Sequence, residues 1–379
     1  MRSLKYFFIL AILTIFVFKS QAQVQPVPPP HQPPNPPDLP QEGKFQHPRQ
    51  GSAQFSPDSI MKAYGDSARE KMAAGDYAGA YKYCDYRIKK TPFRMQFMYY
   101  DRAQAETYLG KVDNAIKDYD TVIMLDSSSA AYMNQAYLYM QVHKTDKAMY
   151  DYGKAIKDTK DSGLLADVYL SRGNAYLSLK QTKEAGSDFT QTLAYNPHSW
   201  QAWLQRGSIY RFSKDYSNAL RDLNEAYKLK PTDPDILLLR GVVMYESGMF
   251  KESISALKES AKVRKNNDTW YYLGMAEMNI RHDSLAREYF TKLLDNDPKN
   301  VLVLNTRGKV NFDMKHPLLA IKDYTKVIEL KPNSGEGYAN RAYVYSSIGE
   351  RDKACADLHK ASSLGLTKAN EAIKKYCGK

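Results

Sequence analysis

The chain has 379 residues, of which 43% are hydrophobic, enough for a large buried core. Its formal net charge of +12 allows nucleic acid, an anionic membrane or an acidic protein as a partner. The Lys and Arg residues alternate with Asp and Glu and form no basic tract with interleaved aromatic side chains, so nucleic-acid binding is not favoured and a solvated basic surface is the simpler interpretation.

The N-terminus predicts a secretory signal peptide. Arg2 and Lys5 precede an apolar run from Tyr6 to Phe18, which is too short to span a bilayer comfortably. Small residues at Ser20 and Ala22 suit cleavage after Ala22, so we expect segment 1–22 to be removed and the mature charge to be 12 − 3 = +9. The alternative is an uncleaved anchor. No stable membrane span is expected after cleavage, because no later stretch is long and apolar enough.

Residues 23–57 are predicted to form a disordered linker. Nine prolines fall between Pro26 and Pro40, and such a segment favours extended polyproline helix over a packed core. We interpret it as a spacer, although it could also be a ligand for a proline-recognition domain.

From residue 58 onward the sequence repeats itself about every 34 residues, and this periodicity predicts the fold. In each repeat a small residue is followed sixteen residues later by a large apolar one, as expected where two paired helices meet closely. The small residues are Ala68, Ala103, Ala136, Gly173, Gly207, Gly241, Gly274, Gly308 and Ala342. Their large counterparts are Cys84, Tyr119, Tyr152, Phe189, Leu223, Leu257, Phe290, Tyr324 and Leu358, where Cys84 is a small hydrophobe.

These repeats resemble the tetratricopeptide repeat (TPR) family, most clearly in YLSRGNAYLSLKQTKEAGSDFTQTLAYNP (169–197) and WLQRGSIYRFSKDYSNALRDLNEAYKLKP (203–231). The resemblance implies an all-α, right-handed superhelical solenoid that binds a protein or peptide, since the fold itself supplies no chemistry. Two departures are Ser253, where alanine is usual, and extra residues near 161–164 that predict a longer loop. The nine repeats expected within 58–366 are 61–95, 96–128, 129–165, 166–199, 200–233, 234–266, 267–300, 301–334 and 335–366.

A basic residue also recurs, at position 7 of the repeat. It is found at Arg102, Arg172, Arg206, Arg240, Arg307 and Arg341. In four of these repeats an Asp follows sixteen residues later, at Asp118, Asp188, Asp222 and Asp323. We predict ion pairs within a repeat or between adjacent repeats; the alternative is an anion-binding ladder, which the Asp charges would neutralise.

The C-terminal segment, 367–379, is predicted to be a capping helix that covers the last repeat. Cys355 begins the second helix of the ninth repeat and Cys377 ends the cap, so antiparallel helices would bring the two thiols together. In an exported protein this predicts a possible disulfide, with two buried thiols as the alternative.

Motifs for chemistry are absent from the sequence. It contains no glycine-rich phosphate loop, HExxH, CxxC or GxSxG, and its seven His residues lack a second ligand at metal-binding spacing. We therefore expect no catalytic residues, cofactor or metal, and a protein that is not an enzyme.

The family resemblance implies that positions 2, 5, 9 and 12 of each first helix line the concave groove. For the Leu residues in particular, the alternative is that these positions are simply core. The chaperone carboxylate clamp known in this family is absent, because position 5 is never Lys. The groove residues are Tyr137 and Met140; Leu170, Asn174 and Leu177; Leu204, Ser208 and Arg211; Leu238, Val242 and Tyr245; Tyr271, Met275 and Met278; and Asn305, Lys309 and Phe312.

Together these features predict an exported scaffold, periplasmic or secreted, that presents a groove to a protein or peptide partner in a bacterial envelope. The alternatives are an envelope-assembly chaperone for several clients and an accessory subunit of an envelope enzyme complex; a glycan-binding role is less favoured. The sequence identifies neither the partner nor the oligomeric state.

Overall fold

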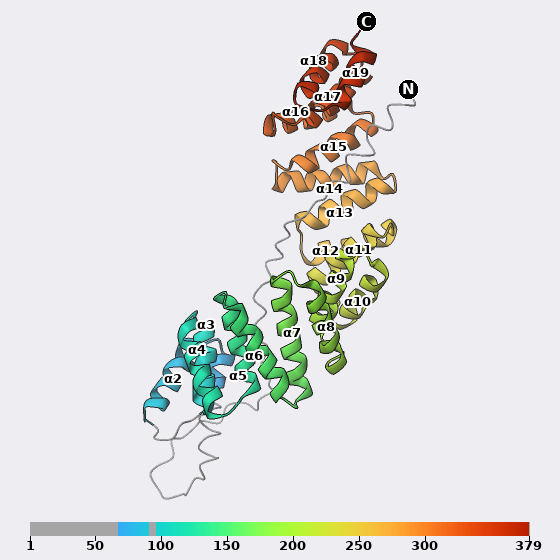
Figure 1. Cartoon of the computed structure of the whole chain (residues 1–379). Coiled ribbons are helices and arrows are strands. Elements are labelled where there is room, and N and C mark those ends of the chain that lie inside the picture. Colours follow the sequence, from blue (N-terminus) through green and yellow to red (C-terminus); the bar gives the residue numbers. More distant parts are fainter. Residues whose placement is uncertain (1–66, 91–95, 379) are drawn as a thin grey trace, which may run out of the picture. The chain divides into compact units, whose positions relative to one another are not determined.

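The computed structural model describes residues 67–90 and 96–378, and all regular secondary structure in this part of the chain is α-helical (Figure 1). The predicted signal peptide, 1–22, and the linker, 23–57, lie outside the described residues. The described residues fall into two compact units, one ending at Tyr195 and the other beginning at Asn196. The all-α fold of paired helices is therefore confirmed, whereas the right-handed superhelix of the whole array stays a prediction.

Unit 1 contains a helical segment at 67–73 followed by α2 to α8. Unit 2 contains α9 to α19. In unit 1 the bounds are α2 (Tyr77–Lys90), α3 (Gln96–Tyr108), α4 (Val112–Leu125), α5 (Ser129–Gln141), α6 (Thr145–Asp158), α7 (Ser162–Ser178) and α8 (Thr182–Tyr195). In unit 2 they are α9 (Trp200–Phe212), α10 (Tyr216–Leu229), α11 (Pro234–Glu246), α12 (Phe250–Val263), α13 (Asn267–Asn279), α14 (Asp283–Asn296), α15 (Val301–Asp313), α16 (Pro317–Leu330), α17 (Gly335–Ser347), α18 (Arg351–Ser363) and α19 (Lys368–Tyr376).

Short polar residues begin the first helix of several repeats. The side chains of Ser128, Ser199 and Asp233 accept hydrogen bonds from backbone N–H groups in the first turns of α5, α9 and α11. These bonds satisfy donors that the helix itself leaves without partners. Gly248 links α11 to α12 with a φ of 84°, a left-handed conformation that glycine adopts without steric cost.

The two helices of a repeat meet at the small residue. A Cβ atom added to Gly173 would lie 2.7 Å from Cε1 of Phe189, and one added to Gly241 would lie 2.6 Å from Cγ of Leu257. Both distances are shorter than real Cβ contacts, so glycine is required for this approach. The predicted pairing of a small residue with a large one is thus confirmed for these repeats.

The two departures from the repeat pattern have different outcomes. Ser253 is fully buried in place of alanine, and its hydroxyl donates to the carbonyl of Gly241 at 2.7 Å, which satisfies the added polar group. The prediction of a longer loop near 161–164 is wrong. Asp161 caps α7, and the extra residues join that helix, which has 17 residues where α5 has 13. A helical continuation satisfies backbone groups that a longer loop would leave to solvent.

The predicted ion pairs are present. Arg172 donates to both carboxylate oxygens of Asp188 at 2.8 and 2.7 Å, and Arg206 does the same with Asp222. Arg102 binds Asp118 in its own repeat and Asp85 in the preceding one, so it joins two repeats. Arg341 and Asp357 form another such pair, and Arg240 binds Asn224 instead. Each carboxylate is occupied by its arginine, as expected for structural pairing.

The C-terminal helix α19 packs on α18, and Ala369 is buried between them. The structure joins Cys355 and Cys377 by a disulfide, with the two Cα atoms 5.7 Å apart. The bond ties the end of the chain to the last repeat. Cys84 is buried, and burial raises the pKa of its thiol to about 12, so it remains protonated.

Replacing glycine by alanine at two helical positions of unit 1 is expected to have opposite effects. Gly173→Ala forces Phe189 to move and is expected to destabilise the protein by about 1–3 kcal/mol, because overpacking strains a filled core. Gly153→Ala, on α6 with no atom within 4 Å of the new Cβ, is expected to stabilise by roughly 0.5–1 kcal/mol. Urea unfolding followed by circular dichroism measures both; equal effects would contradict the packing argument.

Removing the disulfide by Cys355→Ser is expected to lower the stability of the C-terminal repeat. The bond closes a loop with a sequence separation of 22, which corresponds to about 3 kcal/mol in the chain-entropy model. Thermal melts of the protein with and without reductant provide the measurement. Cys84→Ser, which leaves the disulfide intact, shows whether the effect of reductant arises from this bond. An unchanged melt under reducing conditions would contradict the prediction.

Candidate partner-binding surface

The predicted groove residues lie on the first helices of six successive repeats, α5, α7, α9, α11, α13 and α15. Most are half-buried. Val242 and Met275 are buried, with exposed fractions of 4% and 8%, and Leu170 is buried as well. These three side chains therefore belong to the core, as the alternative to a groove position proposed. Asn174 and Leu177 on α7 remain half-buried, as do Leu238, Tyr245, Tyr271, Met278 and Phe312 in unit 2.

The half-buried tyrosines of α11 and α13 contact one another. The ring of Tyr245 lies 5.5 Å from that of Tyr272 and 5.6 Å from that of Phe250, and Tyr271 lies 5.4 Å from Tyr272. Tyr245, Tyr271 and Met278 also pack against the core that includes Phe290. Because each ring is held by neighbours, its orientation is set before any partner arrives, and little side-chain entropy remains to be lost on binding.

The phenols on this surface stay protonated at neutral pH. Burial raises the pKa of Tyr245, raises that of Tyr272 to about 12, and raises that of Tyr271 further. A neutral phenol combines an apolar ring with a hydroxyl that both donates and accepts hydrogen bonds.

The charged residues predicted for the groove are paired within the protein. Arg211 on α9 binds both carboxylate oxygens of Glu246 on α11 at 2.8 and 2.6 Å. Lys309 on α15 binds Asp313 at 2.8 Å. Next to Lys309, the ring of Phe312 lies 5.2 Å from that of Tyr343 on α17. The first-helix surface of unit 2 is therefore aromatic and close to neutral.

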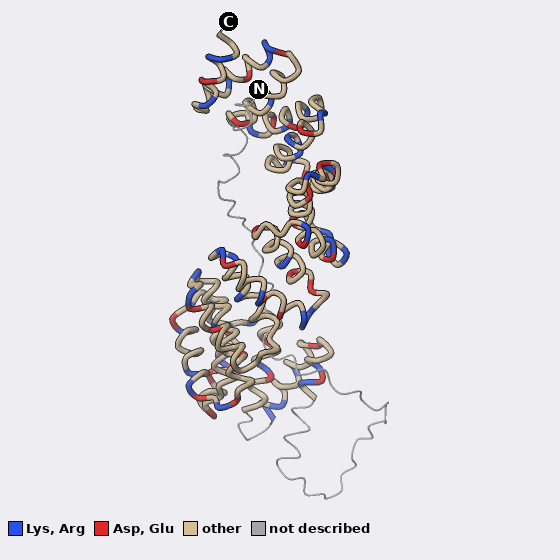
Figure 2. Tube along the Cα trace, turned by 90° about the vertical axis from the view of Figure 1, so that its right-hand side faces the viewer, with Lys and Arg blue, Asp and Glu red and all other residues tan. Residues whose placement is uncertain are grey.

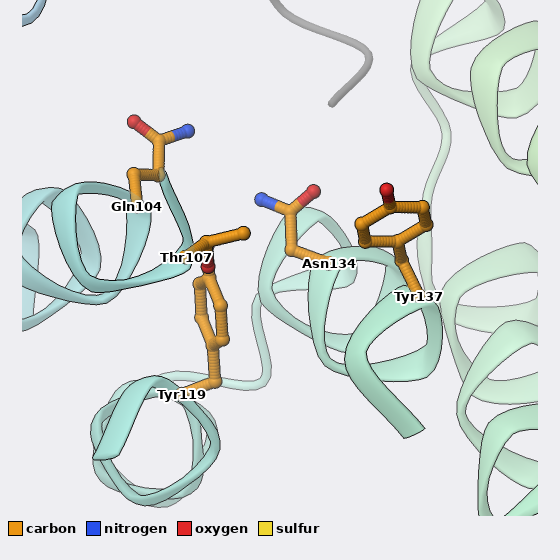
Figure 3. Close-up of a pocket in the computed structure, with 5 residues that line it drawn as sticks. All are labelled: Gln104, Thr107, Tyr119, Asn134 and Tyr137. Atoms are coloured by element: carbon orange, nitrogen blue, oxygen red, sulfur yellow. The ribbon is translucent and has the colours of Figure 1, made fainter. Parts of the chain in front are cut away.

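In unit 1, Tyr137 contributes to a small recess (Figure 3). Gln104 and Thr107 come from α3, Tyr119 from α4, and Asn134 and Tyr137 from α5. The recess measures about 10 Å³, room for one water-sized group. Asn134 is buried, and its amide donates to the Tyr100 hydroxyl at 2.9 Å. Sequence analysis found Tyr137 but missed Gln104 and Asn134. The available signals were that Gln104 has the same repeat position as Tyr137, directly after the small residue, and that Asn134 lies three residues before Tyr137 on α5.

Within residues 67–90 and 96–378, no clustered charge or metal centre marks another site. Lys and Arg are interspersed with Asp and Glu along the described chain (Figure 2). The described residues contain no group of three or more His, Cys, Asp or Glu side chains placed to hold a metal ion. In the same part of the chain, no helix has both the length and the apolar character needed to cross a membrane.

Three buried carboxyl groups of unit 1 each have one oxygen without a hydrogen-bond partner: Asp101, Glu106 and Asp151. Burial raises the pKa of Asp101 to about 6, and Arg69 only partly offsets this shift. The pKa of Glu106 rises to about 7 through burial and the nearby Asp118, with Arg102 and Lys111 opposing the rise. The pKa of Asp151 rises to about 7 through burial and Asp120, opposed by Lys147.

These shifts predict that unit 1 becomes less stable as pH rises from about 4 to about 7. In this window the folded chain holds protons that the unfolded chain has already lost, so raising the pH favours unfolding. Asp151→Asn is expected to flatten the dependence and to stabilise the protein at pH 8, on the order of 1–3 kcal/mol.

Urea unfolding at a series of pH values tests this prediction. Asp146→Asn, which removes an exposed carboxylate from the same helix, is the matched control and is expected to keep the wild-type dependence. Stability that rises with pH between 4 and 7 in the wild type would contradict the prediction.

Family models match four segments of the chain. A model described as "TPR repeat" matches residues 207–248, and models described as "Tetratricopeptide repeat" match residues 98–129, 166–199 and 268–300.

Two curated relatives come from Schizosaccharomyces pombe. The chain is 25% identical to the DnaJ homolog subfamily C member 7 homolog over 69% of its own length and 62% of that protein. It is 23% identical to anaphase-promoting complex subunit 3 over 48% of its length and 27% of that protein. The chain thus spans less than two thirds of the length of these relatives.

Among solved structures, pilF of Pseudomonas aeruginosa aligns with 56% of this chain and 99% of its own, at 17% identity and a TM-score of 0.47. YrrB, whose title describes a TPR protein with an unusual peptide-binding site, aligns with 49% of this chain and 97% of its own, at 19% identity and a TM-score of 0.44.

Proposed function

We propose that this chain, a tetratricopeptide repeat protein, is a non-enzymatic scaffold that binds a protein or peptide partner on the first-helix surface of unit 2. One observation carries the proposal: Tyr245 on α11, Tyr271 and Met278 on α13, and Phe312 on α15 lie half-buried on first helices of successive repeats. Rigid aromatic side chains of this kind are the usual anchors of protein interfaces.

The partner we propose is a segment with apolar side chains, in extended or helical form. The pairing of Arg211 with Glu246 and of Lys309 with Asp313 leaves no unpaired charge at these positions to select a strongly charged partner. Met278 adds an adaptable side chain beside the rings, and the phenol hydroxyls supply polar contacts at their rim.

The place of action that we propose is the bacterial cell envelope, periplasmic or secreted. The support is in the sequence: a basic start, a short apolar run and small residues before position 23, followed by a proline-rich spacer. In this proposal the linker holds the repeats away from the membrane or from a neighbouring protein.

Photo-cross-linking tests where the partner binds. A benzophenone amino acid at position 245 or 271 is expected to form adducts with a partner in cells. The same amino acid at Tyr150, which is 62% exposed on the second helix α6, is expected to form none. Adducts of equal yield from position 150 would move the site away from the first-helix surface.

Substitution tests the contribution of the rings. Tyr245→Ala combined with Tyr271→Ala is expected to weaken partner capture at least tenfold while the helical circular-dichroism signal stays intact, whereas Tyr150→Ala is expected to have no effect. Quantified mass spectrometry of the captured proteins separates the alternatives. One near-equimolar partner supports a dedicated scaffold, and many substoichiometric clients would replace it with a chaperone.

A further inference from the structure

Most of the recurring arginines at position 7 have a second contact besides their hydrogen-bonded partner: an aromatic ring faces the guanidinium. Arg206 lies 5.0 Å from the ring centre of Trp203 and 6.0 Å from that of Tyr210. Arg172 has Tyr169 and Tyr176 at the same two offsets, three residues before and four residues after, and Arg341 has Tyr338 and Tyr345. Each ring thus covers a half-buried guanidinium group, which is a favourable cation–π arrangement.

Arg240 obtains its ring from a different place. The two offsets are occupied by Leu237 and Met244, and Tyr227 of the preceding second helix, α10, lies over the guanidinium at 4.4 Å instead. The repeats therefore use three positions to supply the ring: three residues before the arginine, four residues after it, and thirteen residues before it.

At Arg307 none of these three positions is aromatic. They are Leu304, Asn311 and Leu294. Arg307 keeps its other contacts, donating to both oxygens of Asp323 at 3.1 and 2.6 Å and to Thr291 at 3.2 Å. Its side chain is 21% exposed, within the range of 12% to 23% found for Arg206, Arg341 and Arg172, so Arg307 differs from them in the residue types around it and not in its exposure.

A cleft of about 440 Å³ lies at this place. Its lining side chains come mainly from α14, α15 and α16, three consecutive helices of unit 2, which Figure 1 labels. Arg307 lines the cleft together with Leu294 and Leu304. These two leucines occupy repeat positions that are aromatic beside the arginines of other repeats. Pro298 also lines it and has the same repeat position as Pro197, whose carbonyl accepts a hydrogen bond from the indole of Trp203. The cleft thus coincides with the site of the missing ring.

We propose that this cleft is a docking site for the side chain of a tyrosine or tryptophan on a protein partner, which stacks on Arg307. The internal template is the ring found in the sister repeats, and the volume falls in the ~300–1,000 Å³ range of ligand clefts. The rim carries Lys322 and Lys326 against Asp295 and Glu329, so it selects a neutral group over a charged one. The cleft is lined by residues of the second helices α14 and α16 and by Leu304 and Arg307 of α15, none of which belongs to the first-helix surface proposed above.

Binding of N-acetyl-L-tryptophanamide to the methyl-labelled protein, followed by NMR, tests the proposal. The expected result is saturable shifts of the Leu294 and Leu304 methyl signals, without shifts at Leu223, whose buried cluster packs against Tyr210, one of the rings over Arg206. Leu304→Tyr introduces a ring three residues before Arg307, where Tyr169 and Tyr338 stand relative to Arg172 and Arg341. This variant is expected to bind the probe at least tenfold more weakly, with an unchanged or higher melting temperature. Leu304→Ile, which keeps the cleft open, is expected to bind as the wild type does.

The reverse change provides a second, independent measurement. Trp203→Leu combined with Tyr210→Asn removes both rings over Arg206 and is expected to add a second probe site, reported by new shifts at Leu223, even if Leu304→Tyr folds poorly. The proposal is overturned if the probe shifts no methyl signal at Leu294 or Leu304, or if it binds Leu304→Tyr as tightly as the wild type. Failure here would leave the first-helix surface untouched, because the two sites share no residue.

Discussion

The close approach of two helices at a residue without a bulky side chain is the constraint on which this structure depends. At Gly173, Gly241 and Gly274 the partner ring or leucine occupies the space that a Cβ atom would need. Each such contact sets the distance within a helical hairpin, and each hairpin then offers a face that only its neighbour can cover. The apolar interior is therefore distributed among several clusters along the chain rather than gathered at one centre.

The second repeated interaction joins neighbouring hairpins through polar groups. An arginine from a first helix reaches between second helices, where it binds the aspartate of its own repeat and, at Arg102, Arg307 and Arg341, a residue of the preceding repeat. Two parallel hydrogen bonds and a covering ring restrict the guanidinium more tightly than an exposed ion pair would. The register of one repeat on the next is thus specified by directional contacts as well as by apolar packing.

The same regularity makes local exceptions informative. The surface of α11, α13 and α15 combines rings held by their neighbours with charges already paired, which suits recognition of an apolar protein segment. The cleft at Arg307 is a second exception. Its arginine is present as in the other repeats, but the aromatic ring that faces the guanidinium elsewhere is absent. In a repeat protein such a departure is visible by internal comparison, because the other repeats show what the position ordinarily holds.

Much of the fold could be predicted from the sequence, because the periodic small residues, the large residues sixteen positions later and the recurring Arg and Asp each report a contact within one repeat or between adjacent ones. The disulfide between Cys355 and Cys377 could be predicted for the same reason, because the two residues lie only 22 positions apart on neighbouring helices, and the structure joins them. The sequence did not distinguish the buried residues Val242 and Met275 from Tyr245 and Tyr271, which are partly exposed. All four were assigned to the same helix face, and the sequence does not show how much of that face the next repeat covers. Nor did it show that residues 162–164 extend α7, that Asp151 is buried without a full set of partners, or that a cleft opens beside Leu304. Those features depend on how neighbouring repeats pack, and packing decides exposure, solvation and pKa after the local pattern has already determined the helices.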